Sequence, residues 1–199
     1  RALGGHHGSV HALAASPDGG LLVSAGNDRR VLLWDPVAGR QLGSLSGHGY
    51  DVYALAFSPD GQWLASTGRD RTIILWDIRK RQKVRVFEGH DGPVLALAFS
   101  PDGAWLVSGG KGGQIKRWDV VGGGEIDGLT SHRGQPVSAL AVSPDGRWFA
   151  SSSDSEQVRL WNAETGQPKQ LLAESSGFSA VLAFSPDSRL LALDDVRGV

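Results

Sequence analysis

A repeated tripeptide constrains this chain more than any other feature of its sequence. Ser-Pro-Asp begins at positions 16, 58, 100, 143 and 185, so successive steps are 42, 42, 43 and 42 residues. A Trp follows each of the first four by 18 residues, and a His precedes each of them. Similarity at a fixed period of about 40 residues is the signature of a repeat architecture. We therefore expect a series of similar structural units that share a core.

Each repeat shows the pattern of four short strands. In the first repeat, apolar runs at 10–15, 21–25, 31–34 and 41–45 alternate with turn residues. In Ser16-Pro-Asp-Gly19, Pro presets φ, Asp can bond its own backbone and Gly accepts positive φ, so this stretch predicts a turn. No stretch has a 3.6-residue apolar period, so we expect no helices. The sequence predicts an all-β protein of four-stranded antiparallel sheets.

About 4.7 such repeats of roughly 42 residues are present. Their approximate bounds are 5–46, 47–88, 89–130, 131–173 and, incompletely, 174–199. We expect them to form one continuous segment rather than separate domains, because units of this size bury their core against their neighbours.

Four residue types recur at fixed offsets within the repeats. They are His6, Ser24, Asp28 and Trp34; His48, Ser66, Asp70 and Trp76; His90, Ser108 and Trp118; and His132, Ser151 and Trp161. Ser, His and Asp together could indicate a hydrolase triad, but a triad occurs once per site and not once per repeat. A buried indole N–H needs an acceptor, and a hydroxyl, imidazole and carboxylate can extend that bond into a chain. We interpret the set as a structural hydrogen-bond network and identify no catalytic residue.

These motifs resemble the WD-repeat β-propeller family over essentially the whole chain. The residues that carry the resemblance are Gly47-His48, Ser58-Pro-Asp-Gly61, Leu64-Ala-Ser66, Asp70 and Ile73-Ile-Leu-Trp-Asp77, with their counterparts. The resemblance implies that each repeat supplies one four-stranded blade and that the His–Ser–Asp–Trp set ties its strands together. It also implies a non-catalytic scaffold for protein partners. The alternative is a regulatory or sensor module joined to an enzymatic or effector domain outside this chain.

The later repeats depart from the pattern. Gly112 stands at the Asp position of the third repeat, and Ser155 stands there in the fourth, with Asp154 one residue early. Asn162 replaces the Asp of Trp-Asp, Ser175 replaces a His, and Ser188 replaces a turn Gly. We expect local stability to decline from the first two repeats toward the fifth.

The number of repeats is small for this family, whose rings usually close with about seven blades. The chain opens with Arg1 and contains no Met, which predicts a piece of a longer product and a larger ring. The alternative is self-association that completes the ring, because open ends would expose strand edges.

Two loop sets vary between repeats and are the candidate partner surface. They precede the first strand and join the second strand to the third, and by resemblance they share the usual partner face. The candidate contacts are Arg29, Tyr50, Asp51, Arg69, Arg71 and Lys111. Tyr and Arg suit interface centres because they combine apolar area with directed donors. The alternative is that these are ordinary solvated loops.

Two other motifs are less specific. The basic run Arg79-Lys-Arg-Gln-Lys83, with Arg85, fits a nuclear-import signal, a contact with an acidic partner or a solvated hairpin tip. Gly109-Gly-Lys-Gly-Gly113 lacks the spacing of a phosphate-binding loop.

The overall composition limits the classes of partner. A formal net charge of −1 argues against nucleic acid as the main partner. No apolar run approaches the roughly 18 residues of a membrane span. Without cysteine there is no disulfide or thiolate metal site, and the histidines show no metal-ligand spacing. We expect protein partners, no metal, no cofactor and, since no signal peptide is visible, a cytoplasmic location.

Overall fold

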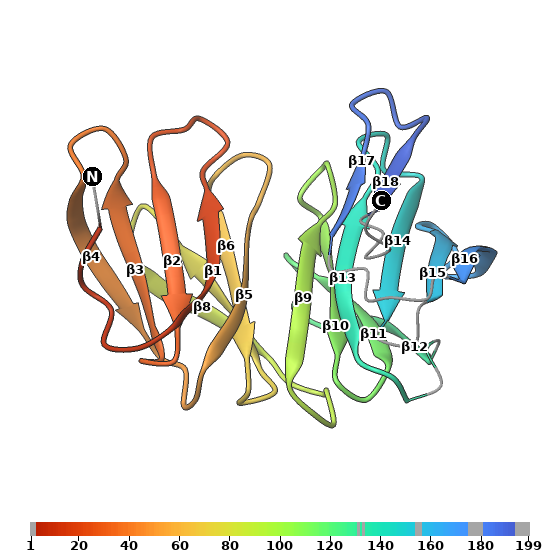
Figure 1. Cartoon of the computed structure of the whole chain (residues 1–199), viewed down its shortest axis with the longest axis horizontal. Coiled ribbons are helices and arrows are strands. Elements are labelled where there is room, and N and C mark those ends of the chain that lie inside the picture. Colours follow the sequence, from red (N-terminus) through yellow and green to blue (C-terminus); the bar gives the residue numbers. More distant parts are fainter. Residues whose placement is uncertain (1–2, 131, 133, 154–156, 175–180, 194–199) are drawn as a thin grey trace, which may run out of the picture. The chain divides into compact units, whose positions relative to one another are not determined.

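The structure of the protein is a computed structural model, and it describes residues 3–130, 132, 134–153, 157–174 and 181–193. These residues form eighteen strands and no helix, which confirms the predicted all-β class (Figure 1). No membrane-spanning helix is therefore found in this described part of the chain.

The strands form four four-stranded antiparallel sheets and one two-stranded sheet, which we call blades 1 to 5. Neighbours in sequence are neighbours in each sheet. Blade 1 contains β1 (Val10–Ala15), β2 (Leu22–Gly26), β3 (Arg30–Asp35) and β4 (Arg40–Ser46), and blade 2 contains β5 (Val52–Phe57), β6 (Trp63–Gly68), β7 (Ile73–Asp77) and β8 (Gln82–Phe87). Blade 3 contains β9 (Val94–Phe99), β10 (Trp105–Gly110), β11 (Gln114–Asp119) and β12 (Glu125–Thr130), and blade 4 contains β13 (Val137–Val142), β14 (Trp148–Ser153), β15 (Gln157–Asn162) and β16 (Pro168–Glu174). Blade 5 contains β17 (Leu182–Phe184) and β18 (Leu191–Leu193).

The chain divides into two compact units. The N-terminal unit, Arg1–Val94, holds blades 1 and 2, and the C-terminal unit, Leu95–Val199, holds nearly all of blade 3 together with blades 4 and 5.

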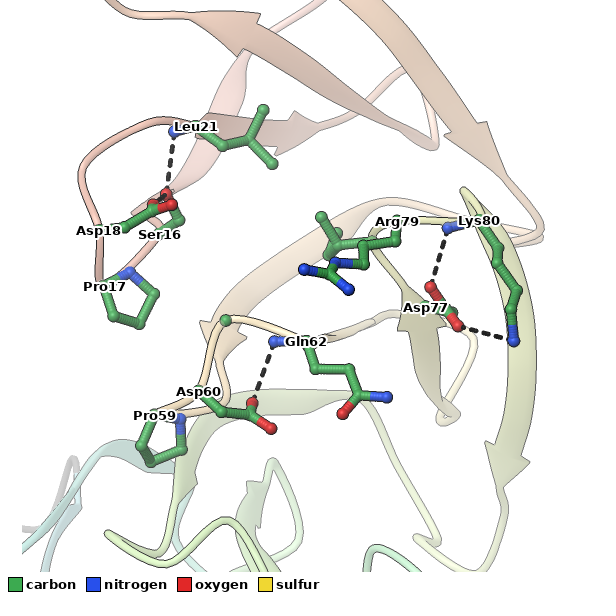
Figure 2. Close-up of a pocket in the computed structure, with 12 residues that line it drawn as sticks. Ser16, Pro17, Asp18, Leu21, Pro59, Asp60, Gln62, Asp77, Arg79 and Lys80 are labelled. Carbon is green, nitrogen blue, oxygen red and sulfur yellow. Dashed lines mark hydrogen bonds and ion pairs between the residues drawn. The ribbon is translucent and has the colours of Figure 1, made fainter.

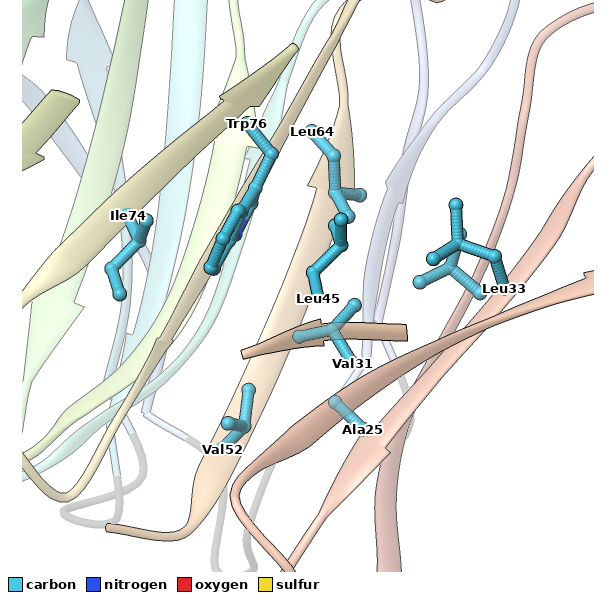
Figure 3. Close-up of a cluster of buried hydrophobic side chains, with 9 residues drawn as sticks. Ala25, Val31, Leu33, Leu45, Val52, Leu64, Ile74 and Trp76 are labelled. Carbon is cyan, nitrogen blue, oxygen red and sulfur yellow. The ribbon is translucent and has the colours of Figure 1, made fainter. Parts of the chain in front are cut away.

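The core of the N-terminal unit lies between blades 1 and 2. Figure 3 shows Trp76, Leu64 and Val52 of blade 2 facing Val31 and Leu45 of blade 1. The third strands of blades 1 and 2 are buried on both faces, and in β3 Val31, Leu32, Leu33 and Trp34 are all at most 3% exposed. A strand covered on both sides has a continuous apolar sequence rather than an alternating one, which explains the apolar runs before Trp34 and Trp76.

The C-terminal unit repeats this arrangement. Val107 and Ile115 of blade 3 pack against Val137, Phe149 and Trp161 of blade 4. The Phe149 and Trp161 rings are stacked, with centroids 5.7 Å apart. A second cluster joins Ala139, Ala150 and Val158 of blade 4 to Leu182 of blade 5. Blade 1 thus packs its apolar residues against blade 2 in the N-terminal unit, and blade 4 packs against blades 3 and 5 in the C-terminal unit.

The Ser-Pro-Asp turns close the hairpin between the first and second strands of every blade. In the turn that begins at Ser58, the Ser58 Oγ donates to Asp60 Oδ1 at 2.5 Å and accepts from the Trp63 N–H at 2.9 Å. The fourth turn position is left-handed, with φ of 71° at Gly19 and 61° at Ser188. Ser188 adopts the same conformation as the glycines, and its Oγ accepts from the Asp145 N–H at 3.0 Å.

A buried cation interrupts the apolar core of the C-terminal unit. Arg117 occupies the β11 position that is Leu33 in β3 and Leu75 in β7, and it is 5% exposed. Its guanidinium forms a two-pronged ion pair with Asp127 and donates to the Ala163 carbonyl of the neighbouring blade. The pair therefore replaces apolar packing with directed bonds.

Candidate partner-binding face

The recurrent polar residues of the N-terminal unit lie in two hydrogen-bonded chains. In blade 2, the Trp76 indole N–H donates to Ser66 Oγ at 2.7 Å, and Ser66 Oγ lies 2.6 Å from His48 Nε2. His48 Nδ1 lies 2.7 Å from Asp70 Oδ2. Blade 1 has the same order, with Trp34 to Ser24 at 2.8 Å and Ser24 to His6 at 2.6 Å. His6 then contacts Asp28 at 2.9 Å.

The carboxylate at the end of each chain is held in its ionised form. Burial alone would raise the pKa of Asp70, but the hydrogen bond and charge of His48 and the backbone N–H groups of Thr72 and Gly49 outweigh it and lower that pKa. Asp28 shows the same balance, with the pKa lowered by the His7 N–H and by His6. An ionised carboxylate only accepts, so Nδ1 of each His carries the proton.

The networks of blades 3 and 4 differ from this pattern. Trp118 donates to Ser108 Oγ at 2.8 Å in blade 3, where position 112 is a glycine and provides no carboxylate. In blade 4, Trp161 donates to Ser151 Oγ at 2.8 Å, and Ser151 Oγ lies 2.8 Å from His132 Nε2. Residues 154, 155 and 175, which the sequence comparison singled out, lie outside the described residues.

His132 is the most perturbed titratable group of these networks. It is 0% exposed, and among the described residues its Nδ1 has no hydrogen-bond partner. Burial, together with the positive charge of Arg159, lowers the pKa of His132 to about 4. The imidazole is therefore neutral at pH 7.

The Ser–His–Asp geometry resembles a hydrolase triad, but its surroundings do not suit catalysis. Ser66 is 0% exposed, and its oxygen already accepts the Trp76 N–H. A nucleophile must reach the substrate, and this oxygen is closed off by the core of its own blade. Within the described residues, no group of three or more His, Cys, Asp or Glu side chains could hold a metal ion.

The networks support the loops at one end of the blades. The β2–β3 and β6–β7 turns each dock on the loop that precedes the first strand, with Asn27 N to Ser9 O at 3.0 Å and Arg69 N to Asp51 O at 2.9 Å. A Cβ at Gly68 would overlap the carbonyl oxygen of Asp51, so only glycine permits this close approach. The two loop sets therefore form one connected surface in blade 1 and in blade 2.

Arginines occupy a strained position in these turns. Arg29 and Arg71 have φ of 64° and 67°, whereas the equivalent third turn residue in blade 3 is Gly113, with φ of 79°. A non-glycine residue in the left-handed region costs about 1–2 kcal/mol. Such strain is often found at functional sites, although Arg81 and Ser188 adopt the same conformation in other turns of this protein.

The other candidate contacts lie beside these arginines in the N-terminal unit. Tyr50 is 57% exposed, and the Arg69 guanidinium lies 5.9 Å from its ring centroid. Arg69 also approaches Asp51 at 3.9 Å. Arg29 donates to the Gly49 carbonyl at 3.3 Å and so joins the blade 1 turn to the blade 2 loop. Lys111 lies in the C-terminal unit, exposed at the β10–β11 turn.

A hollow lies at the opposite end of blades 1 and 2. It has a volume of about 880 Å³ and is lined by two Ser-Pro-Asp turns and the β7–β8 turn. Figure 2 shows Arg79 extending into it, whereas Lys80 is paired with Asp77 at 3.3 Å. Asp18 and Asp60 each use Oδ1 within their own turn, at 3.0 Å from the N–H of Gly20 and Gln62. The hollow thus combines cations and carboxylates and has no clear charge preference.

The basic run forms the β7–β8 turn and the start of β8. Arg81 donates to the Leu42 carbonyl at 2.8 Å and so ties this turn to β4 of blade 1. All five residues from 79 to 83 are exposed.

Comparison with known proteins agrees with this architecture. The model of the family described as WD domain, G-beta repeat matches residues 1–35, 39–77, 81–119 and 123–162, more than half of the chain. The chain therefore belongs to the WD-repeat family. The second match begins just before β4 and ends at Asp77 of β7, so the family repeat and the blade are offset by one strand.

Individual relatives match a much shorter stretch. Over 43 residues the chain is 51% identical to the small ribosomal subunit protein RACK1 of Glycine max and 54% identical to RACK1z of Arabidopsis thaliana. The match covers 22% of this chain and 13% of each relative, so the chain aligns with only a small part of the length of these relatives.

Proposed function

We propose that this chain is a non-catalytic scaffold that presents loops on rigid blades to partner proteins. The observation that carries the proposal is the contrast between the two kinds of polar residue. The recurrent His, Ser and Asp groups bond to one another inside the blades, whereas Tyr50, Arg69 and Arg71 on the same loops face solvent.

Rigidity is what suits such a surface to binding. The loops are held by backbone bonds, by the close approach at Gly68 and by the network beneath them. A surface that is ordered before its partner arrives loses less conformational entropy when the complex forms. The repeats at 5–46, 47–88, 89–130, 131–173 and 174–199 would act as one propeller segment, with a cytoplasmic location and without nucleic acid or membrane partners.

The matched relatives indicate only the general class of function. RACK1 proteins are named as small ribosomal subunit proteins, so they work within an assembly. Since the match covers 13% of their length, we infer from them an interaction role for this chain and not the ribosome as its partner.

The test is a quantitative affinity capture from the source cells with the purified chain as bait. We expect specific proteins to be recovered by the unaltered chain and lost with the double variant Tyr50→Ser/Arg69→Ser. Val37→Ser is the control, because Val37 is 90% exposed at the β3–β4 turn, at the other end of β3. Equal recovery with both variants would contradict the proposed face.

A further inference from the structure

The partner face of the N-terminal unit carries a surplus of exposed positive charge. We call Arg29, Tyr50, Asp51, Arg69 and Arg71 the arginine face. Of the carboxylates in residues 7–9, 27–30, 49–51 and 69–72, all within the described part of the chain, Asp28 and Asp70 have side chains only 6% and 11% exposed and are bonded to histidines. Asp51 lies beside Arg69. The groups that reach solvent are therefore mainly guanidinium groups.

Those guanidinium groups have N–H donors that a ligand could bind. Arg29 uses one guanidinium nitrogen, which donates to the Gly49 carbonyl. Arg69 has one long ion pair, in which a guanidinium nitrogen lies 3.9 Å from a carboxylate oxygen of Asp51. Among the described residues, no side-chain hydrogen bond or ion pair is found for Arg71. An arginine presents five N–H donors in a planar fork that matches a carboxylate, so the face can accept several carboxylates at once.

The backbone conformation of Arg29 and Arg71 is a second argument that their guanidinium groups serve in binding. Arg29 and Arg71 both sit in the left-handed position that blade 3 fills with Gly113. Glycine would adopt that conformation without strain, so the turn itself has no need of an arginine.

Tyr50 adds an apolar element to the charged surface. Its ring is more than half exposed and lies under the Arg69 guanidinium. An aromatic ring between cations can pack against an apolar side chain of a ligand while the arginines bind its neighbours.

We propose that the arginine face binds an acidic segment of a partner protein, with several Asp or Glu residues around one apolar side chain. This inference rests on the proposed scaffold function and specifies its partner. A peptide fits better than nucleic acid, because the cations are confined to a few turns and the chain has a formal net charge of −1, whereas phosphate binding rests on an extended array of Lys and Arg.

Fluorescence anisotropy with the full chain tests this proposal. The probe is a fluorescein-labelled peptide of ten glutamates with a central leucine, and the reference peptide has glutamine in place of glutamate. We expect tighter binding of the glutamate peptide, weakened by added salt. The double variant Arg29→Gly/Arg71→Gly should weaken that binding by about tenfold, as expected for the loss of two charge contacts.

The control variant is Arg79→Ser/Lys83→Ser, which removes two exposed cations of the same unit at the opposite end of the blades. It should bind the glutamate peptide within about twofold of the unaltered chain, since only the distant charge changes. Urea unfolding should show that the glycine variant is folded. Equal losses in both variants, or no preference for glutamate, would overturn the proposal.

A single-stranded RNA of mixed sequence serves as competitor. If it displaces the peptide at lower concentration than the unlabelled peptide does, the face is a nucleic-acid site and the proposal is wrong. If the peptide fails to bind while affinity capture still depends on Tyr50 and Arg69, the scaffold function stands and only its acidic partner is rejected.

Discussion

At the scale of single residues, the turn or hydrogen-bond network around a side chain sets its backbone strain or its pKa. The left-handed arginines are a clear case, because an L-residue is strained where the backbone of Gly113 is not. We predict that Arg71→Gly raises the free energy of unfolding by about 0.5 kcal/mol, since relief of strain exceeds the added freedom of the unfolded chain.

Arg69→Gly is the matched control for that prediction. Arg69 lies two residues earlier in the same turn and is not among the residues with positive φ. Replacement there relieves no strain, adds unfolded-state entropy and removes the exposed contacts with Tyr50 and Asp51, so urea denaturation should show a loss of about 0.5–1 kcal/mol. A loss in both variants would mean that Arg71 is not strained.

His132 should make stability depend on pH. Its folded pKa is about 4, below the ordinary value of 6.5, because burial and Arg159 disfavour the charged form. The unfolded chain therefore takes up the proton first, and the free energy of unfolding falls as the pH drops from 6.5 toward 4, by up to about 3 kcal/mol.

Two measurements check this expectation. An NMR titration should place the midpoint of the His132 ring near pH 4, and the variant His132→Gln should lose the slope of stability between pH 6.5 and 4.5. A ring that titrates near pH 6.5 would show that the buried environment does not hold in solution.

At the scale of the blade, the networks differ in completeness. Ser66 bonds to Trp76 and His48 in a chain that ends on Asp70, whereas the blade 3 position of that Asp is Gly112. We predict that Ser66→Ala lowers the free energy of unfolding by about 1–3 kcal/mol and that Ser108→Ala costs less, because its network has no terminal charge to organise. Equal losses on equilibrium unfolding would contradict this account.

Replacing the two partners of the Arg117–Asp127 ion pair in blade 3 should change the free energy of unfolding by unequal amounts. Asp127→Ala leaves the Arg117 guanidinium buried without its carboxylate and should cost about 3–5 kcal/mol. Arg117→Leu restores the residue type found at Leu33 and Leu75, and combined with Asp127→Ala it should recover most of that loss. Calorimetric comparison of the single and double variants tests this, and a double variant no more stable than Asp127→Ala would refute it.

At the scale of the whole molecule, the exposed face of β1 favours self-association. Leu55 in β5 and Leu140 in β13 pack against a neighbouring blade, but the equivalent Leu13 in β1 is 66% exposed and Val10 is 46% exposed. We predict a mass above 21.1 kDa by light scattering coupled to size exclusion, and a shift toward that monomer mass in Leu13→Lys. A clean monomer with the unaltered chain would exclude association through this face.

Much of the fold follows from local sequence. The Ser-Pro-Asp turns, the short strand-like runs between them and the Trp at a fixed offset predict the period and the strands, because turn chemistry and strand pattern act over a few residues. Strand ends moved by about one position, as in β2, which begins at Leu22 rather than 21, and β4, which begins at Arg40 rather than 41. Those ends depend on pairing with the next strand.

The candidate site was less accessible to sequence reasoning. Recurrence identified the His, Ser, Asp and Trp positions, but the left-handed φ of Arg29 and Arg71 and the low pKa of His132 depend on contacts across the blade. The Arg117–Asp127 pair was missed altogether. Its signal was Lys116-Arg117 where the first two repeats have an apolar pair, as in Leu32-Leu33.

The sequence by itself determined the repeat, the all-β class and the membership of the WD-repeat family, because these are carried by spacing and turn residues that act locally. Only the tertiary structure decided which polar groups are closed inside blades and which face solvent. Burial requires a neighbouring blade, and no single repeat contains the partner against which its apolar face is packed.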